Sequence, residues 1–196
     1  MGLTSYKEIL SAVAIALTLI AYVPYICTII RGTTKPHVFS WIIWGASTLM
    51  VFFAQLASNA GVGAWVVGFS GSITMSIAIL AFVKRGDVSI TRVDWMFFTA
   101  AMTALGLWKL TSDPLWAVVI LTVVDVLAFG PTVRKVLNNP YSESGIFYFT
   151  FTVRNSLVIM ALESYSLTTM LFPAAMALSC VLMTVVIAYC RRMRVA

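Results

Sequence analysis

The chain has very little charge: only 10% of its 196 residues are Asp, Glu, Lys or Arg, whereas 61% are hydrophobic. A soluble globular domain carries about 25% charged residues and about 45–50% apolar ones. A domain of this length is too small to enclose so large an apolar fraction, because small domains leave much of their surface exposed. The composition therefore excludes soluble enzymes, nucleic-acid binders and secreted scaffolds, and it predicts an integral membrane protein surrounded by lipid.

Histidine and cysteine are also scarce. His37 is the only histidine, and Cys27, Cys180 and Cys190 are far apart, without a C-x-x-C pair. A zinc site or a bis-histidine haem needs more such ligands, and a thiol–disulfide relay needs the close pair. We therefore expect no metal, no cofactor and no enzymatic activity, and we interpret the cysteines as small apolar fillers between helices.

Long uncharged runs dominate the sequence instead. A helix needs about 20 apolar residues to cross the hydrocarbon core of a bilayer. The apolar runs, two of them interrupted once by a charge at Asp125 and Arg154, are divided at turn clusters. They predict seven such helices, at residues 8–30, 38–57, 62–84, 92–110, 115–137, 145–165 and 167–190. The fold class that follows is an all-α integral membrane protein with seven transmembrane helices.

Lys and Arg are distributed unevenly between the two sides of this predicted membrane domain. One side holds only Lys7 and Lys109. The other side holds ten basic residues: Arg31, Lys35, Lys84, Arg85, Arg92, Arg134, Lys135, Arg191, Arg192 and Arg194. Because cytoplasmic loops carry an excess of Lys and Arg, we predict an outside N-terminus and a cytoplasmic C-terminus, in a bacterial inner membrane or plasma membrane. The net charge of +6 reflects this bias and predicts no nucleic-acid partner.

An internal repeat relates the two ends of the chain. An offset of 107 residues superposes the first three predicted helices on the last three without a gap, and Pro24 then falls on Pro131. The chain divides into a three-helix repeat at 8–84, a linker helix within 85–113 and a second three-helix repeat at 114–192. Each repeat has an odd number of helices, and one linker helix separates the two. Both repeats therefore insert in the same orientation, as two parallel three-helix bundles.

The segments around the two prolines carry a resemblance to a known superfamily. Pro131-Thr132 is followed by Ser142-Glu143-Ser144-Gly145, which is similar to a Pro-Gln pair followed about a dozen residues later by Ser-x-Glu-Gly. This pattern resembles the SWEET/PQ-loop transporter superfamily in its full-length form of three helices, a linker helix and three helices. The resemblance implies transport of a small molecule by alternating access.

The sequence departs from the sugar-carrying members of that superfamily. The Gln of the Pro-Gln pair is absent from both copies, and neither 62–84 nor 167–190 contains the Asn that sugar carriers place there. The Trp41-x-x-Trp44 pair and the full-length layout also resemble vitamin-nucleoside permeases of the PnuC type. We therefore predict a small polar or aromatic substrate and leave open whether it is a vitamin, nucleoside, amino acid or sugar. Assembly into a homo-oligomer also stays open.

Aromatic and polar side chains share one face of two predicted helices, because residues three, four and seven apart lie along one stripe. The stripes consist of Trp41, Trp44, Thr48 and Gln55, and, at the offset of 107, of Tyr148, Phe151, Asn155 and Leu162. Aromatic walls with a few polar groups are typical of small-molecule cavities. We predict that the substrate binds Trp41, Trp44, Thr48, Tyr148, Phe151 and Asn155. The alternative for Trp41 and Tyr148 is an aromatic belt at the membrane surface, since both lie near helix ends.

Asp125 and Arg154 are each the only charge deep within their predicted helix. An unpaired charge at the bilayer centre costs at least ~2.5–3.5 kcal/mol, so both side chains should face the interior of the bundle. We expect the two to pair, either as a permanent salt bridge or as part of the substrate site. In the second case Arg154 holds a substrate carboxylate or phosphate, or Asp125 carries a coupling proton.

Pro24 and Pro131 are predicted hinges. Proline removes one backbone hydrogen bond and clashes with the carbonyl four residues earlier, so two prolines at matching depth would let the helix ends beyond them swing. The alternative is that each proline only ends a helix. The predicted function is a transporter or facilitator of a small metabolite, with the lipid bilayer and the substrate as partners. The alternative function is a non-transporting receptor or assembly partner with the same fold.

Overall fold

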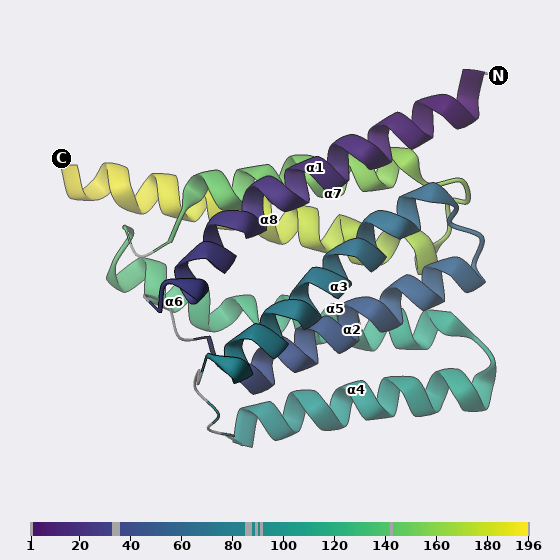
Figure 1. Cartoon of the computed structure of the whole chain (residues 1–196), viewed down its shortest axis with the longest axis horizontal. Coiled ribbons are helices and arrows are strands. Elements are labelled where there is room, and N and C mark those ends of the chain that lie inside the picture. Colours follow the sequence, from purple (N-terminus) through teal and green to yellow (C-terminus); the bar gives the residue numbers. More distant parts are fainter. Residues whose placement is uncertain are drawn as a thin grey trace.

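The computed structural model describes residues 2–32, 36–84, 88, 90, 92–141 and 143–195. Within these ranges the chain is all-α, and its helices run back and forth along one direction (Figure 1). Eight helices are described: α1 (Gly2–Ile30), α2 (Val38–Ala57), α3 (Val62–Val83), α4 (Arg92–Thr111), α5 (Pro114–Leu127), α6 (Phe129–Asn138), α7 (Gly145–Ala161) and α8 (Leu167–Val195).

The bundle has two ends, between which the described helices alternate (Figure 1). We call the first the Ala60 end, where α2 turns into α3 and α7 turns into α8. The second is the Glu143 end, where α1 finishes, α2 begins and α6 turns into α7. The N-terminus lies at the Ala60 end and the C-terminus at the Glu143 end, on the right and the left of Figure 1.

Four of the described helices are long and apolar enough to cross a membrane. They are Tyr6–Ile30 within α1, all of α2 and α3, and Leu167–Met193 within α8. Helices α5 and α7 are apolar but shorter, and α4 contains three charged residues, Arg92, Asp94 and Lys109. The chain is therefore a multi-pass membrane protein, and the expected total of seven spans stays a prediction.

The predicted helix at 115–137 is interrupted in the structure, which corrects the sequence prediction. Helix α5 ends at Leu127, Ala128 forms a turn and α6 begins at Phe129. Pro131 accounts for the break, because a proline offers no N–H to the carbonyl of Leu127, four residues earlier. The proline lies in the first turn of α6, where a missing N–H is tolerated.

The other predicted boundaries fall close to the observed ones. Helices α2, α3 and α4 agree with the sequence to within one residue, whereas α7 ends at Ala161 instead of residue 165. Helices α1 and α8 extend further at the two chain ends than predicted. Pro24 lies inside α1, which continues to Ile30, so this proline does not end its helix.

The helices pack as two groups with α4 on the outside (Figure 1). In the first group α3 packs against both α1 and α2, and in the second group α8 packs against α5, α6 and α7. The groups meet where α1 contacts α7 and where α2 contacts α5. At the offset of 107 residues α1 corresponds to α5 and α6, α2 to α7, and α3 to α8, so these two contacts between the groups are equivalent.

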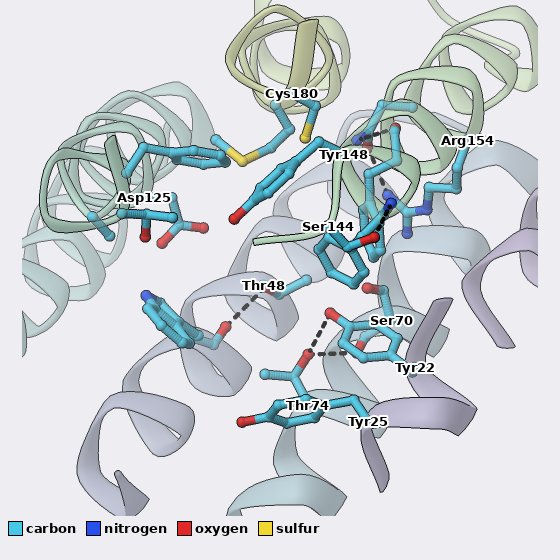
Figure 2. Close-up of a pocket in the computed structure, with 18 of the residues that line it drawn as sticks. Tyr22, Tyr25, Thr48, Ser70, Thr74, Asp125, Ser144, Tyr148, Arg154 and Cys180 are labelled. Atoms are coloured by element: carbon cyan, nitrogen blue, oxygen red, sulfur yellow. Dashed lines mark hydrogen bonds between the residues drawn. The ribbon is translucent and has the colours of Figure 1, made fainter. Parts of the chain in front are cut away.

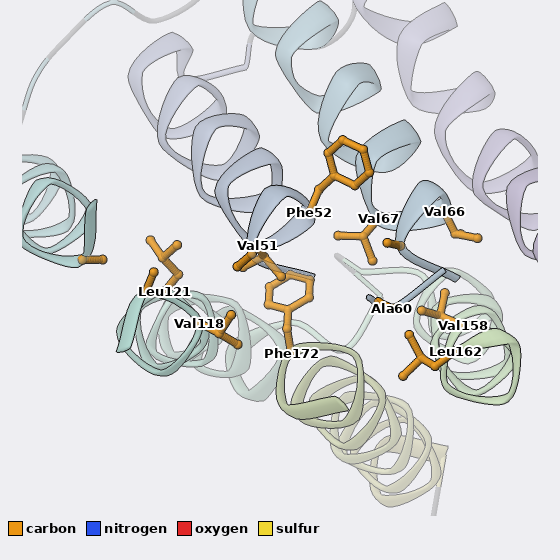
Figure 3. Packing of buried hydrophobic residues seen from close by; sticks show 14 of the residues in the cluster. Val51, Phe52, Ala60, Val66, Val67, Val118, Leu121, Val158, Leu162 and Phe172 are labelled. Carbon is orange, nitrogen blue, oxygen red and sulfur yellow. The ribbon is translucent and has the colours of Figure 1, made fainter. Parts of the chain in front are cut away.

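The larger hydrophobic core lies toward the Ala60 end and joins the two groups. Figure 3 shows Val51, Phe52 and Val67 of the first group together with Leu121 and Phe172 of the second. The backbones approach so closely here that a Cβ atom on Gly63 of α3 would lie 3.0 Å from the amide nitrogen of Leu162. The same atom would lie 3.0 Å from the carbonyl oxygen of Val158.

Candidate functional site

A cavity of about 520 Å³ lies between the two helix groups (Figure 2). Helices α1, α2 and α3 of the first group and α5, α6, α7 and α8 of the second all contribute to its walls. The structure brings all eight predicted binding residues together on these walls: Trp41, Trp44, Thr48, Asp125, Tyr148, Phe151, Arg154 and Asn155. That they bind a substrate stays a prediction.

The cavity reaches one end of the bundle but not the other. Glu143 and the exposed Ser144, in the connection between α6 and α7, form part of its wall. Toward the Ala60 end the described lining stops at residues such as Ser70, Asn155 and Phe172, and Phe172 already belongs to the large apolar core. The space is therefore a pocket that opens at the Glu143 end and is closed by packed side chains at the Ala60 end.

Arg154 of α7 is buried and satisfied by partners other than Asp125. Its Nε donates to the Thr18 hydroxyl of α1 at 3.3 Å, and its Nη2 donates to the carbonyl oxygen of Val66 in α3 at 2.9 Å. Its Nη1 donates to the side-chain oxygen of Asn155 at 2.7 Å. The guanidinium group therefore ties α7 of the second group to two helices of the first.

Asp125 of α5 is also buried, with 8% of its surface exposed, but its environment is different. Its Oδ1 atom has no hydrogen-bond partner among the described residues. Asp125 is nevertheless one of the residues that line the cavity.

The predicted salt bridge between Asp125 and Arg154 is wrong for the described residues. Figure 2 shows the two side chains on opposite sides of the pocket. The physical reason is the order of the helices, because α8 packs against both α5 and α7. Helices α5 and α7 are therefore separated by α8, and the charges that they carry do not meet.

Aromatic rings form much of the wall at the Glu143 end. Trp41 stacks on Tyr25 with ring centroids 5.2 Å apart, and it meets Trp44 edge-on at 5.6 Å. On the facing side Phe151 meets Tyr22 edge-on at 5.6 Å. These contacts place Trp41 within the bundle beside α1, and they give the cavity apolar faces at the end where it opens.

Tyr148 of α7 lines the cavity and contacts the connection between α6 and α7. Its side chain is buried, and its hydroxyl donates to Oε2 of Glu143 at 3.2 Å. Both residues line the pocket. The belt interpretation of Tyr148 therefore does not describe its contacts, which lie inside the second group.

Sequence reasoning missed several wall residues. Tyr22, Tyr25, Phe129 and Thr132 all line the cavity. The internal repeat contains the signal that finds them, because the offset of 107 pairs Tyr22 with Phe129 and Tyr25 with Thr132. Pairs of residues that the repeat superposes are thus good candidates for the wall of one cavity between the two groups.

Other predicted positions lie away from the pocket. Gln55 and Leu162, the last members of the two stripes, are buried near the Ala60 end and do not belong to the described lining. Pro24 is likewise absent from it. Among the basic and motif residues, Lys35, Arg85 and Ser142 lie outside the described part of the chain.

No family model, curated protein or solved structure matches this chain. The described residues also contain no group of three or more His, Cys, Asp or Glu side chains placed to hold a metal ion. The site offers aromatic surface, hydroxyl groups and one unpartnered carboxyl oxygen, which are groups that bind a small organic molecule.

Proposed function

We propose that the chain is a membrane transporter or facilitator of a small polar or aromatic metabolite that works by alternating access. The observation that carries this proposal is the asymmetry of the cavity. It lies between two helix groups, opens at the Glu143 end and is closed at the Ala60 end. A binding site that is exposed to one side only, between two groups able to rock against each other, is what alternating access requires.

Hydrogen bonds between the groups support this proposal. Lys7 of α1 donates to the carbonyl oxygen of Leu162 at 2.6 Å, and the amide of Glu163 donates to the carbonyl oxygen of Ala60 at 2.9 Å. Gln55 of α2 donates through Nε2 to the carbonyl oxygen of Thr169 in α8 at 2.8 Å. These bonds close the Ala60 end, and breaking them is the step that would expose the cavity to the other side.

The helix break at Ala128 supports a mobile wall at the opposite end. Helix α6 follows this break and contributes Phe129 and Thr132 to the cavity. A joint at this position would allow α6 to move while α5 stays packed against α2. Pro131 is then one hinge, as the sequence predicts, and Pro24 within α1 is its counterpart in the first group.

We include in this proposal that the chain is a member of the SWEET/PQ-loop superfamily. The motif after Pro131 resembles the SWEET/PQ-loop pattern, and the equivalent contacts α1–α7 and α2–α5 are compatible with two parallel three-helix bundles. With the Lys and Arg distribution as a guide, the Glu143 end faces the cytoplasm. A reporter that is active only in the cytoplasm, fused after Ala196, should therefore give signal, and a silent but well-expressed fusion would contradict this orientation.

The test of transport is uptake by liposomes that contain the purified full-length protein. Candidate metabolites cover vitamins, nucleosides, amino acids and sugars. Once one is taken up, a disulfide between Ala60→Cys and Glu163→Cys, in a background without the three native cysteines, should lock the Ala60 end. We expect oxidation to stop uptake and reduction to restore it, with the same protein serving as its own control.

Two results would contradict this proposal. Full uptake by completely cross-linked protein would exclude movement at the Ala60 end. Failure of correctly folded protein to take up any of the candidates would favour the alternative function, a receptor or assembly partner of the same fold.

A further inference from the structure

The carboxyl group of Asp125 is the one charged group of the described cavity wall for which the structure shows an atom without a partner. Its Oδ1 is buried, and burial of a charge without a partner is strongly unfavourable. Arg154 does not neutralise it, because the donors of that guanidinium group point to Thr18, Asn155 and Val66. Asp125 thus lines the cavity with a carboxyl group for which the described residues supply no donor to Oδ1.

The internal repeat shows what stands in the equivalent place in the other half. The offset of 107 superposes Thr18 on Asp125, and Ser47 on Arg154. Across the α1–α7 contact, the guanidinium group of Arg154 donates to Thr18. Across the equivalent α2–α5 contact, the small Ser47 takes the position of the arginine, and its buried Oγ also has no partner among the described residues. At the superposed positions, one half thus has a cation that donates to Thr18, and the other has two buried oxygens, of Ser47 and Asp125, without a described partner.

The charge of the wall favours a cationic ligand. Among the described lining residues, Asp125 and Glu143 are acidic, whereas Arg154 is the only basic one and is already engaged. Nine of the described lining residues are aromatic, with Trp44 and Tyr148 among them. The faces of such rings attract cations and also hold flat apolar groups. A volume of about 520 Å³ is suited to an organic molecule and far exceeds a bare metal ion.

We propose that the cavity binds an organic amine whose ammonium group pairs with Asp125, in the place that the guanidinium group of Arg154 occupies in the other half. The apolar or aromatic remainder of the ligand lies against the aromatic wall. This proposal rests on the proposed transport function and names its substrate class. It differs from the sequence expectation of an anionic substrate held by Arg154, which the structure shows as a tie between helices.

The first test compares three probes that share a phenyl ring and differ in charge. These are 2-phenylethylamine, the neutral 2-phenylethanol and the anion phenylacetate, each titrated into the purified full-length protein in detergent by calorimetry. We expect the amine to bind at least about tenfold more tightly than the alcohol, since a hydrogen bond to a charged group contributes that much. Phenylacetate should bind most weakly. Binding of the amine that is undetectable, or no tighter than that of the alcohol, would overturn the proposal without any variant being needed.

The second test uses Asp125→Asn, which preserves the shape of the side chain and removes its charge. The affinity for 2-phenylethylamine should fall about tenfold or more, to that of the alcohol, while the affinity for the alcohol stays unchanged. Glu163→Gln is the matched control, because it removes an exposed carboxylate that does not line the described cavity, and it should leave both affinities unchanged. An unchanged affinity for the amine in Asp125→Asn would overturn the proposal.

A final arm separates an organic amine from an inorganic ion. Amine binding is measured in sodium chloride and in potassium chloride at equal ionic strength, and we expect the same affinity in both. Stronger competition by sodium would assign Asp125 to an inorganic cation and overturn the proposal.

Since binding needs no membrane, amine binding without liposome uptake of any candidate contradicts only the transport function. Uptake of a neutral or anionic metabolite without amine binding contradicts only the substrate class.

Discussion

The two ends of the bundle are held together in different ways. At the Ala60 end the hydrogen bonds of Lys7, Gln55 and Glu163 all run between the two helix groups. At the Glu143 end Arg191 donates to the carbonyl oxygens of Pro140 and Glu143, within the second group alone. The described hydrogen bonds therefore join the two groups at the Ala60 end, whereas those of Arg191 at the Glu143 end stay within the second group.

The difference also extends to packing. Apolar side chains from both groups fill the Ala60 end (Figure 3). Gly63 allows α3 to approach α7 there. A smaller cluster toward the Glu143 end, which includes Val136, Met183 and Ile187, lies within the second group. Polar contacts and apolar packing thus place the joint between the groups at the same end. Substitutions that weaken this joint should therefore lower stability more than matched substitutions elsewhere.

The largest effect is expected for Arg154→Ala. The substitution removes the donors to Thr18 and Val66 and leaves a space where the guanidinium group was. We expect the free energy of unfolding in detergent to fall by roughly 3 kcal/mol, from lost hydrogen bonds and the cavity together. The control Arg191→Ala removes two bonds to carbonyls within one group and should cost only about 1 kcal/mol. Equal losses in the free energy of unfolding would show that the bonds of Arg154 between the groups contribute no more than bonds within one group.

The next effect is expected for Gly63→Ala. Its Cβ would lie 3.0 Å from backbone atoms of both Val158 and Leu162, so the two groups must shift apart. Overpacking of this kind costs about 1–3 kcal/mol in the free energy of unfolding. Gly106→Ala in α4 is the matched control, because its Cβ would have no described atom within 4 Å. That control should be neutral or slightly stabilising, by up to about 1 kcal/mol. A neutral Gly63→Ala would mean that the contact is looser than the structure shows.

Local signals in the sequence were enough to predict most of the helices and eight residues of the cavity wall. Turn clusters fixed the ends of α2 and α3, and the 3.6-residue periodicity placed Trp44 and Phe151 on inward faces. The pairing of Asp125 with Arg154 could not be predicted in this way. It depends on which helices are neighbours. The position of α8 between α5 and α7 is set by tertiary packing, which local sequence patterns do not predict. Pro131 led to the prediction of a hinge, but the sequence did not indicate that the helix ends at Leu127.

A smaller effect is expected for Gln55→Leu, and its cause can be tested by rescue. Pro173 in α8 has no N–H for the carbonyl oxygen of Thr169, which Gln55 satisfies from the other group. Loss of this bond should lower the free energy of unfolding by about 1–2 kcal/mol. In a Pro173→Ala background the alanine N–H can serve the Thr169 carbonyl, so the same substitution should cost clearly less. An equal cost in both backgrounds would exclude this explanation.

The smallest effect is expected for Lys7→Met, at the edge of the same joint. The Lys7 ammonium group donates to the Leu162 carbonyl and lies 5.8 Å from the centre of the Tyr165 ring, but it is only half-buried. A hydrogen bond so close to the surface contributes about 0.5 kcal/mol, because water replaces the lost partner. The control Lys109→Met removes an exposed lysine of α4 and should have no measurable effect on unfolding. The Lys7 loss should also change little with salt, because its partners are a neutral carbonyl and a ring. A loss as large as that of Arg154→Ala would instead place the main closure of the Ala60 end at the N-terminus of α1, rather than at the buried contacts of α3 and α7.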